Sequence, residues 1–109
     1  MLKNKTKNSI VSKEIKILSG FFKKGVGLIG KKPEAVILHT RFGVHTFGMK
    51  YPLDILILDN SLKVVILKEN LMPNRIFLWN PMYKTVIELK GGTIKNSKTQ
   101  INDVLEVKL

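Results

Sequence analysis

The sequence contains no cysteine, and this absence excludes disulfides, thiol catalysis and thiolate metal ligands. It also contains no uncharged apolar run long enough to cross a bilayer. The stretch from residue 9 to residue 22 comes nearest, but Lys13, Glu14 and Lys16 interrupt it, so it fits neither a membrane span nor a signal-peptide core. Together these absences predict a cytoplasmic protein of a reducing compartment, without a membrane span.

Acidic residues are scarce, since 8 Asp and Glu stand against 19 Lys and Arg, for a net charge of +11. The excess is uneven, because residues 1–32 carry nine lysines and a single acidic residue, Glu14. Such a charge favours weak, salt-sensitive contact with polyanions, although a lysine-rich surface also simply keeps a chain soluble. Nearly all the basic residues are Lys and are not interleaved with aromatic residues, so we expect nucleic acid to bind only weakly and non-specifically.

A chain of 109 residues, 44% of them hydrophobic, is long enough for one domain with its own core and too short for two. Residues 1–8 are polar and predict a flexible basic N-terminus, followed by a single β domain over residues 9–109. The glycine-rich segment 20–30 has partly helix-spaced apolar residues, which predict one short helix. The polar residues 95–102 predict a loop.

From residue 35 onward the pattern is typical of strands, with short apolar runs separated by Gly, Pro, Asn and Asp. A turn signal at residues 59–61 predicts a hairpin between two of these runs, and a shorter strand-like run surrounds Ile15 and Ile17. The expected strands from residue 35 cover residues 35–39, 44–49, 53–59, 63–69, 75–79, 85–90 and 103–108. The fold class predicted is mainly β: a compact single-domain barrel or sandwich of about six to eight strands, with one short helix near residues 20–30.

Asp54 lies within the apolar run 53–59, where a buried strand normally carries Val or Ile. An ionised carboxylate there is strongly destabilising unless neighbours bond to it. One interpretation makes Asp54 a buried strut, which accepts hydrogen bonds from a loop backbone or pairs with Arg41, Lys50 or Arg75. The other makes it part of a polar pocket for a small polar or anionic ligand.

The segment around Asp54 reads HTFGMKYPLDILILD over residues 45–59, and further motifs are GLI at 27–29, LMPNR at 71–75, VIELKGG at 86–92 and INDVL at 101–105. In this order, over roughly residues 15–109, they resemble the widespread bacterial and archaeal domain-of-unknown-function family numbered 192. The chain departs from the family pattern with Asn102 for a usual glycine, Gly91 for a usual alanine, and Lys23 and Lys24 near a usual arginine. The resemblance implies a small, mainly β domain with one short helix, and it implies no established activity.

The residues themselves predict a non-catalytic binding or accessory module, with a small polar pocket that holds a small ligand or a protein partner. The candidate ligand-binding residues are His45, Thr46, Lys50, Asp54, Arg75 and Glu88. One alternative is a small hydrolase that uses His45 and a carboxylate. Another is a weak polyanion-binding module that uses the N-terminal lysines.

No catalytic residue, metal ligand or cofactor is predicted. The two histidines lack the close spacing of a metal site, and the G-x-G-x-x-G pattern at 25–30 lacks the strand and long helix of a dinucleotide site. Met72, Trp79 and Tyr83 lie near two prolines, where they either cap one end of the fold or form an exposed apolar rim.

Overall fold

The strands form three sheets in the computed structural model, which describes residues 1–17, 35–41 and 43–108. In chain order the elements are β1 (Leu2–Asn4), β2 (Ser9–Ser12), β3 (Lys16–Ile17), β4 (Ala35–His39), β5 (Gly43–His45), β6 (Leu53–Leu58), β7 (Val64–Leu71), β8 (Ile76–Leu78), β9 (Thr85–Lys90), α1 (Thr93–Ser97) and β10 (Leu105–Val107). The short helix predicted near residues 20–30 lies outside the described residues.

The central sheet has five strands in the order β3-β4-β9-β6-β7. Its inner strands carry mainly apolar side chains on both faces, and all six residues of β6 are buried, because the sheet is covered on both sides. One face packs a cluster that includes Val36, Ile55 and Val86, and the opposite face packs a cluster that includes Leu56 and Leu89. Alternation along each strand thus divides the core into two layers.

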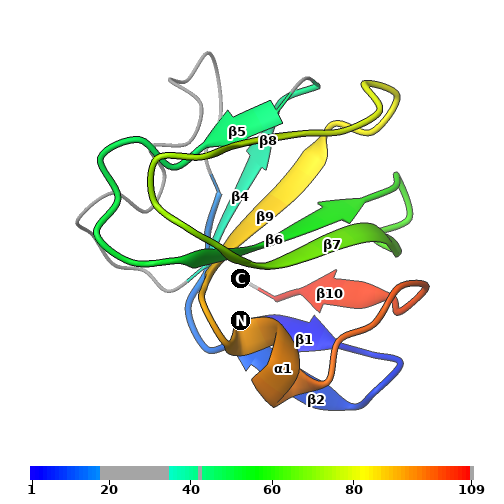
Figure 1. Cartoon of the computed structure of the whole chain (residues 1–109). Helices are drawn as coiled ribbons and strands as arrows, with labels where there is room; N and C mark the ends of the chain where they lie inside the picture. The colour runs from blue at the N-terminus through cyan, green and yellow to red at the C-terminus, as the bar shows by residue number, and fades with distance from the viewer. Residues whose placement is uncertain (18–34, 42, 109) are drawn as a thin grey trace.

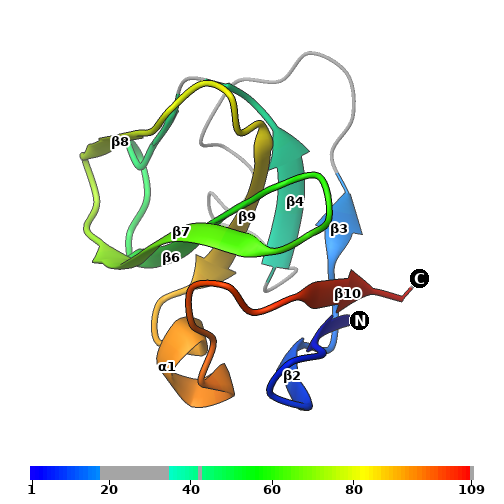
Figure 2. The same cartoon turned by 90° about the vertical axis from the view of Figure 1, so that its right-hand side faces the viewer.

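The two smaller sheets lie on opposite sides of the central sheet. Figure 1 shows the two-stranded ribbon β5-β8 above it, and the three-stranded sheet β10-β1-β2 with α1 below it. Figure 2, turned by 90°, keeps this order, and the two chain ends lie close together because β1 pairs with β10. The sheets do not close into a barrel, so the architecture resembles a sandwich.

The predicted mainly β class is therefore confirmed, and so is the hairpin at residues 59–61, which joins β6 to β7. The Asp59 carboxylate accepts the amides of Ser61 at 2.8 Å and Lys63 at 3.0 Å, which fixes this turn. The described residues contain ten strands, more than the six to eight predicted. The excess comes from short pieces such as β1 and β2, whose polar sequences carry no clear period.

Three local predictions were wrong. Residues 1–8, predicted as flexible, include β1, in which Leu2 and Asn4 are fully buried between β2 and β10. The strand expected over 44–49 ends at His45, because the Thr46 carbonyl accepts the Met49 amide at 3.1 Å and closes a turn. The loop predicted over 95–102 overlaps α1, whose first turn is held by contacts with a distant strand that no local pattern encodes.

Candidate functional site

Asp54 is fully buried in β6, and its carboxylate accepts three backbone hydrogen bonds. One oxygen accepts the amide of Asn70 at 2.9 Å, and the other accepts the amides of Gly92 at 3.1 Å and Ile94 at 2.9 Å. Asn70 lies near the end of β7 and the other two residues lie at the start of α1, so this side chain ties both elements to the central sheet. The geometry fits the strut interpretation, with loop amides as the partners.

Glu88 is fully buried in β9, and neither of its carboxylate oxygens has a hydrogen-bond partner among the described residues. Its cross-strand neighbours are Val36 on β4 and Ile55 on β6, so hydrocarbon has replaced the water that would solvate the charge. Burial raises the pKa of this carboxyl from 4.5 to about 7. Near neutral pH, Glu88 is therefore a mixture of the acid and the carboxylate.

The side chains of Asp54 and Glu88 face opposite sides of the central sheet. In the register between β6 and β9, Asp54 lies opposite Leu89 and Ile55 lies opposite Glu88. Paired residues share a face and successive residues alternate, so the Asp54 and Glu88 side chains point away from each other. They cannot line one pocket, and they do not form the paired carboxylates that a glycosidase-like site requires.

Thr46 is fully buried and fastens the loop before β8 to the end of β5. Its hydroxyl donates to the Met72 carbonyl at 2.6 Å and accepts the Arg75 amide at 2.9 Å. Its own amide donates to the Arg75 carbonyl at 2.9 Å, and its carbonyl accepts the Asn74 amide at 3.1 Å. Because these contacts occupy its polar groups, Thr46 has a structural role in shaping the ribbon.

Of the other predicted residues, Lys50 and Arg75 are exposed, and His45 is half-buried at the end of β5. The His45 Nδ1 accepts the Phe47 amide at 3.3 Å, and the two rings stack with their centroids 4.9 Å apart. The Arg75 guanidinium donates a long bond to the Asn74 carbonyl at 3.5 Å. The ribbon thus brings together His45, Thr46 and Arg75, while Asp54 and Glu88 belong to the two core layers.

The outer side of the ribbon carries an apolar surface, which sequence reasoning only partly anticipated. Register places Ile76 opposite His45 and Leu78 opposite Gly43, so these residues share one face. We call this surface the ribbon face and define it by four exposed side chains, with exposed fractions in parentheses: Phe47 (47%), Met72 (52%), Ile76 (61%) and Leu78 (68%). They are four of the nine large apolar side chains that are exposed in the described part of the chain.

The glycine at position 43 makes this close pairing possible. A Cβ atom there would lie 2.5 Å from Leu78 Cδ2 and 2.6 Å from the Phe77 carbonyl oxygen. Only a residue without a side chain fits between the two strands. The three predicted rim residues Met72, Trp79 and Tyr83 do not share one environment. Met72 is exposed, whereas Trp79 is buried and donates its indole N–H to the Tyr83 carbonyl at 2.7 Å.

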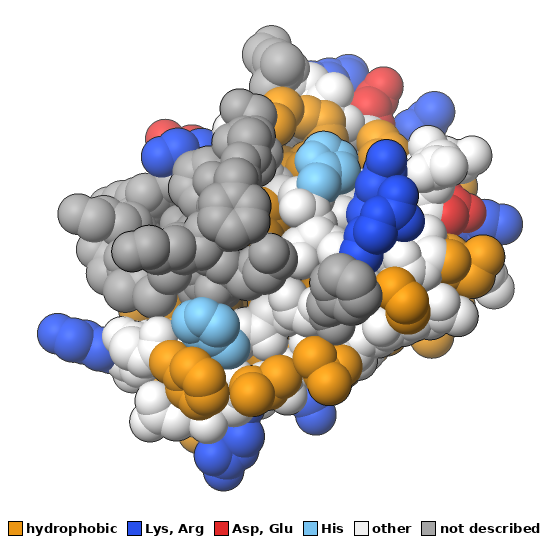
Figure 3. All heavy atoms as spheres, turned by 90° about the horizontal axis from the view of Figure 1, so that it is seen from above, with side chains coloured by type: hydrophobic (Ala, Val, Ile, Leu, Met, Phe, Trp, Pro, Cys, Tyr) orange, Lys and Arg blue, Asp and Glu red, His pale blue; other side chains and the backbone are white. Residues whose placement is uncertain are grey.

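The segments that build the ribbon and its ends, residues 39–52 and 70–84, contain no Asp or Glu. They contain four basic residues, Arg41, Lys50, Arg75 and Lys84, all of them exposed. Figure 3, which looks down on this side of the molecule, shows hydrophobic side chains gathered along one border with a histidine beside them, and carboxylates only near the outline. The ribbon face is therefore apolar, and the segments that build it carry positive charge and no carboxylate.

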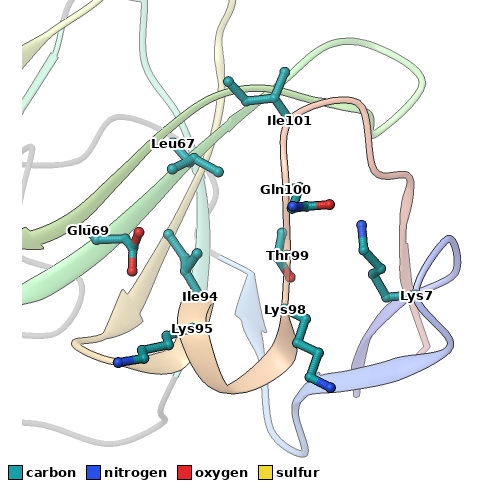
Figure 4. A pocket seen from close by; sticks show the side chains of 9 residues that line it. All are labelled: Lys7, Leu67, Glu69, Ile94, Lys95, Lys98, Thr99, Gln100 and Ile101. Carbon is teal, nitrogen blue, oxygen red and sulfur yellow. The ribbon is translucent and has the colours of Figure 1, made fainter.

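A hollow lies on the other side of the molecule from the ribbon, and none of the predicted site residues lines it. It is an open groove of about 1080 Å³ between β7, α1 and the loop after α1, with Leu67, Ile94 and Thr99 along it (Figure 4). Lys7 borders it, but its ammonium group is bonded to both oxygens of Asp103 at 2.8 Å.

The Asp103 carboxylate also belongs to a buried network that joins the two chain ends. It accepts the Asn4 side-chain amide at 2.9 Å and the Gln100 backbone amide at 2.9 Å, while Asn4 also donates to the Thr99 hydroxyl at 3.1 Å. Burial acts to raise the pKa of Asp103, but the hydrogen bonds from Lys7, Asn4 and Gln100 outweigh it and lower the pKa below 3.8. The groove is therefore bordered by a structural clasp.

In the part of the chain that the structure describes, no three His, Asp or Glu side chains gather as a metal site would require. Within the same residues, no helix is both long and apolar enough to cross a membrane. The arrangement of the described side chains does not indicate catalysis.

Comparisons with known proteins agree with this fold. The chain is 29% identical to the UPF0127 protein PH1112 of Pyrococcus horikoshii, with 97% of each chain covered. It is 32% identical to a UPF0127 protein of Thermococcus sibiricus, over 97% of this chain and 73% of that one.

Two solved structures share the fold at 19% identity. One is a protein of unknown function from Novosphingobium aromaticivorans (TM-score 0.67, covering 86% of this chain and 73% of that one), and the other a putative transcription regulator from Sinorhizobium meliloti (TM-score 0.60, covering 75% and 70%). The model of the DUF192 family, described as uncharacterized ACR, matches residues 2–107. The chain therefore belongs to the DUF192 family, whose curated relatives carry the name UPF0127.

Proposed function

We propose that this domain is a non-catalytic binding module that docks an acidic protein partner on the ribbon face. The observation that carries the proposal is the exposure of Ile76 and Leu78 on a short ribbon whose segments contain basic residues and no carboxylate. Exposed apolar side chains that cluster within a polar rim mark interaction sites more often than isolated ones do. The positive surround favours a partner of opposite charge.

The predicted polar pocket is replaced in this proposal by a surface. Thr46 supports the surface from below, and His45 lies within it, stacked on Phe47. Asp54 and Glu88 have no part in it, since their side chains are in the two core layers. Arg75 and Lys50 keep a binding role as exposed cations at its border.

A display selection tests the proposal without a known partner. A random peptide library is selected against the protein, and the enriched peptides are titrated by fluorescence anisotropy against Ile76→Ser/Leu78→Ser. The matched control is Ile10→Ser/Ile101→Ser, which removes two apolar side chains of similar exposure, 52% and 53%, outside the ribbon.

We expect the selected peptides to be rich in Asp and Glu, to bind the wild type and the control equally, and to lose at least tenfold in affinity for the ribbon variant. Both double variants must show the wild-type circular dichroism spectrum, which separates lost binding from lost folding. A failure to enrich any peptide, or enriched peptides that bind all three proteins alike, would overturn the proposal.

A further inference from the structure

The outer edge of β8 has no strand partner in the described part of the chain, and it lies beside the ribbon face. β8 pairs only with β5 among the described strands. The Thr46 amide donates to the Arg75 carbonyl, so Thr46 and Arg75 form a hydrogen-bonded pair, and the pairing alternates from there along the ribbon. Phe77 therefore directs its backbone groups toward β5, whereas Ile76 and Leu78 direct their N–H and C=O groups outward.

We infer that the partner is an extended segment that adds to β8 as a third strand of the ribbon; this inference rests on the proposed docking function. Ile76 and Leu78 are two positions apart in the strand, so together they offer two N–H donors and two C=O acceptors at the spacing of an extended chain. Adding a strand to an open sheet edge satisfies such groups, and side-chain contacts then select the sequence.

Alternation also specifies the side chains of the added segment. Residues of the segment that share a face with Ile76 and Leu78 lie beside exposed aliphatic surface and should be apolar. The intervening residues share the face of Phe77, which is half-buried against the core, and of Arg75, an exposed cation with no carboxylate partner among the described residues. The fitting partner is therefore an extended peptide with aliphatic side chains beside Ile76 and Leu78 and an acidic side chain within reach of Arg75.

Other occupants fit the same surface less well. A second copy of the chain would bring two acid-free, basic ribbons together, and like charges oppose this pairing. A lipid surface could take up the apolar side chains but could not donate to or accept from the Ile76 and Leu78 backbone in the matching pattern. Single-stranded nucleic acid stacks on aromatic rings, whereas the centre of the ribbon face is aliphatic.

The short length of β8 disfavours pairing of this edge with another copy of the protein. The strand has three residues, and Pro73 and Pro81 lie on either side of it in the chain. Short edge strands bounded by proline resist continued pairing between copies. They also limit the partner contact to a few residues, so we expect binding that is weak and reversible.

A synthetic peptide of sequence EVEVEIE tests the inference, with the protein labelled with ¹⁵N for NMR. Its matched controls are the same peptide N-methylated on the valine and isoleucine amides, which removes the backbone donors that an added antiparallel strand directs toward β8 but keeps charge and side chains, and the charge-reversed peptide KVKVKIK. We expect EVEVEIE to slow amide exchange at Ile76 and Leu78 at least tenfold and to leave Phe77, already bonded to β5, unchanged. Both controls should bind at least tenfold more weakly.

The outcomes separate this inference from the proposed function. If peptides from the display selection bind at the ribbon face but neither they nor EVEVEIE protect the Ile76 and Leu78 amides, strand addition is wrong and docking stands. If the N-methylated peptide binds as well as EVEVEIE, strand addition is also wrong. If no peptide binds, both fail.

Two further measurements address the competing occupants. Sedimentation with phosphatidylglycerol vesicles that is lost in Ile76→Ser/Leu78→Ser, without peptide binding, would show a membrane surface to be the occupant and overturn both proposals. A dimer in analytical ultracentrifugation that the same substitutions dissociate would show a second copy to be the occupant, with the same consequence.

Discussion

Replacing Glu88 by leucine should make the protein more stable at alkaline pH and should remove one component of its pH dependence. Glu88 is fully buried, its oxygens have no hydrogen-bond partner among the described residues, and its cross-strand neighbours Val36 and Ile55 are apolar. An unpaired carboxylate in such surroundings is destabilising. A leucine of similar volume would instead extend the apolar cluster on that face.

The sign and size of the effect follow from the raised pKa. The pKa of Glu88 in the fold is about 7, against 4.5 for the solvated group, so the folded state holds this proton more tightly than the unfolded state. The stabilisation from the bound proton is complete below pH 4.5, and it is lost as the pH rises to about 7 and beyond. Over this pH range the free energy of unfolding falls by on the order of 3 kcal/mol, which is the shift in the pKa of Glu88 multiplied by the energy equivalent of one pKa unit.

Urea unfolding followed by circular dichroism, from pH 4.5 to 8.5, measures the effect as the difference between wild type and Glu88→Leu. The difference removes the contributions of groups that titrate alike in both proteins. Glu88→Gln is the second variant, because it removes the charge but keeps a buried polar group and should flatten the same pH window with a smaller gain in stability. An unfolding free-energy difference that stays constant across this range, or that favours the wild type increasingly as the pH rises, would refute the reasoning.

Three further predictions concern the strut, the clasp and the ribbon. Asp54→Ala should lower the free energy of unfolding by about 3–5 kcal/mol, because it leaves three backbone amides without an acceptor; a loss below about 1 kcal/mol in urea unfolding would mean that water replaces the carboxylate. Lys7→Met should lower the free energy of unfolding by about 1 kcal/mol at pH 6. The difference from wild type should shrink as the pH falls below 3.8, because the lowered pKa of Asp103 stabilises the fold only above that range. Equal losses at pH 3 and pH 6 would contradict this. Gly43→Ala should cost about 1–3 kcal/mol, since the added methyl group would meet the backbone of β8, and an unchanged thermal midpoint would show that the ribbon yields.

Much of the fold was predictable because its core strands carry strong local signals. β4, β6 and β9 are apolar runs interrupted in their interiors only by Asp54 and Glu88, and turn residues such as Asp59 mark their ends. Such strands are buried on both faces, so the runs are easy to locate. The weaker elements were missed for the opposite reason, since β1 is held by its partners β2 and β10 and has no distinctive pattern of its own.

The candidate site was less predictable, because its geometry depends on register. The sequence shows that Asp54 and Glu88 each interrupt an apolar strand, but only the pairing of Asp54 with Leu89 shows that they face opposite layers. A change of register by one residue would have placed both on one face. The sequence contains a partial indication of the ribbon face, because Met72 was predicted either to cap the fold or to lie in an exposed apolar rim, and it is exposed. The outward direction of Ile76 and Leu78 depends instead on their pairing with β5.

Asp54 and Glu88 show why a buried carboxylate is not by itself a sign of a binding site. Both are fully buried in neighbouring strands, yet they differ in what the chain brings back to them. The start of α1 and the end of β7 return to Asp54 with three amide donors, whereas the strands beside Glu88 contribute only valine and isoleucine side chains. The first carboxylate stabilises the fold through its hydrogen bonds, and the second destabilises it whenever it is ionised. Neither of them can meet a ligand at the surface, and the proposed docking function therefore uses the ribbon, whose apolar side chains are exposed.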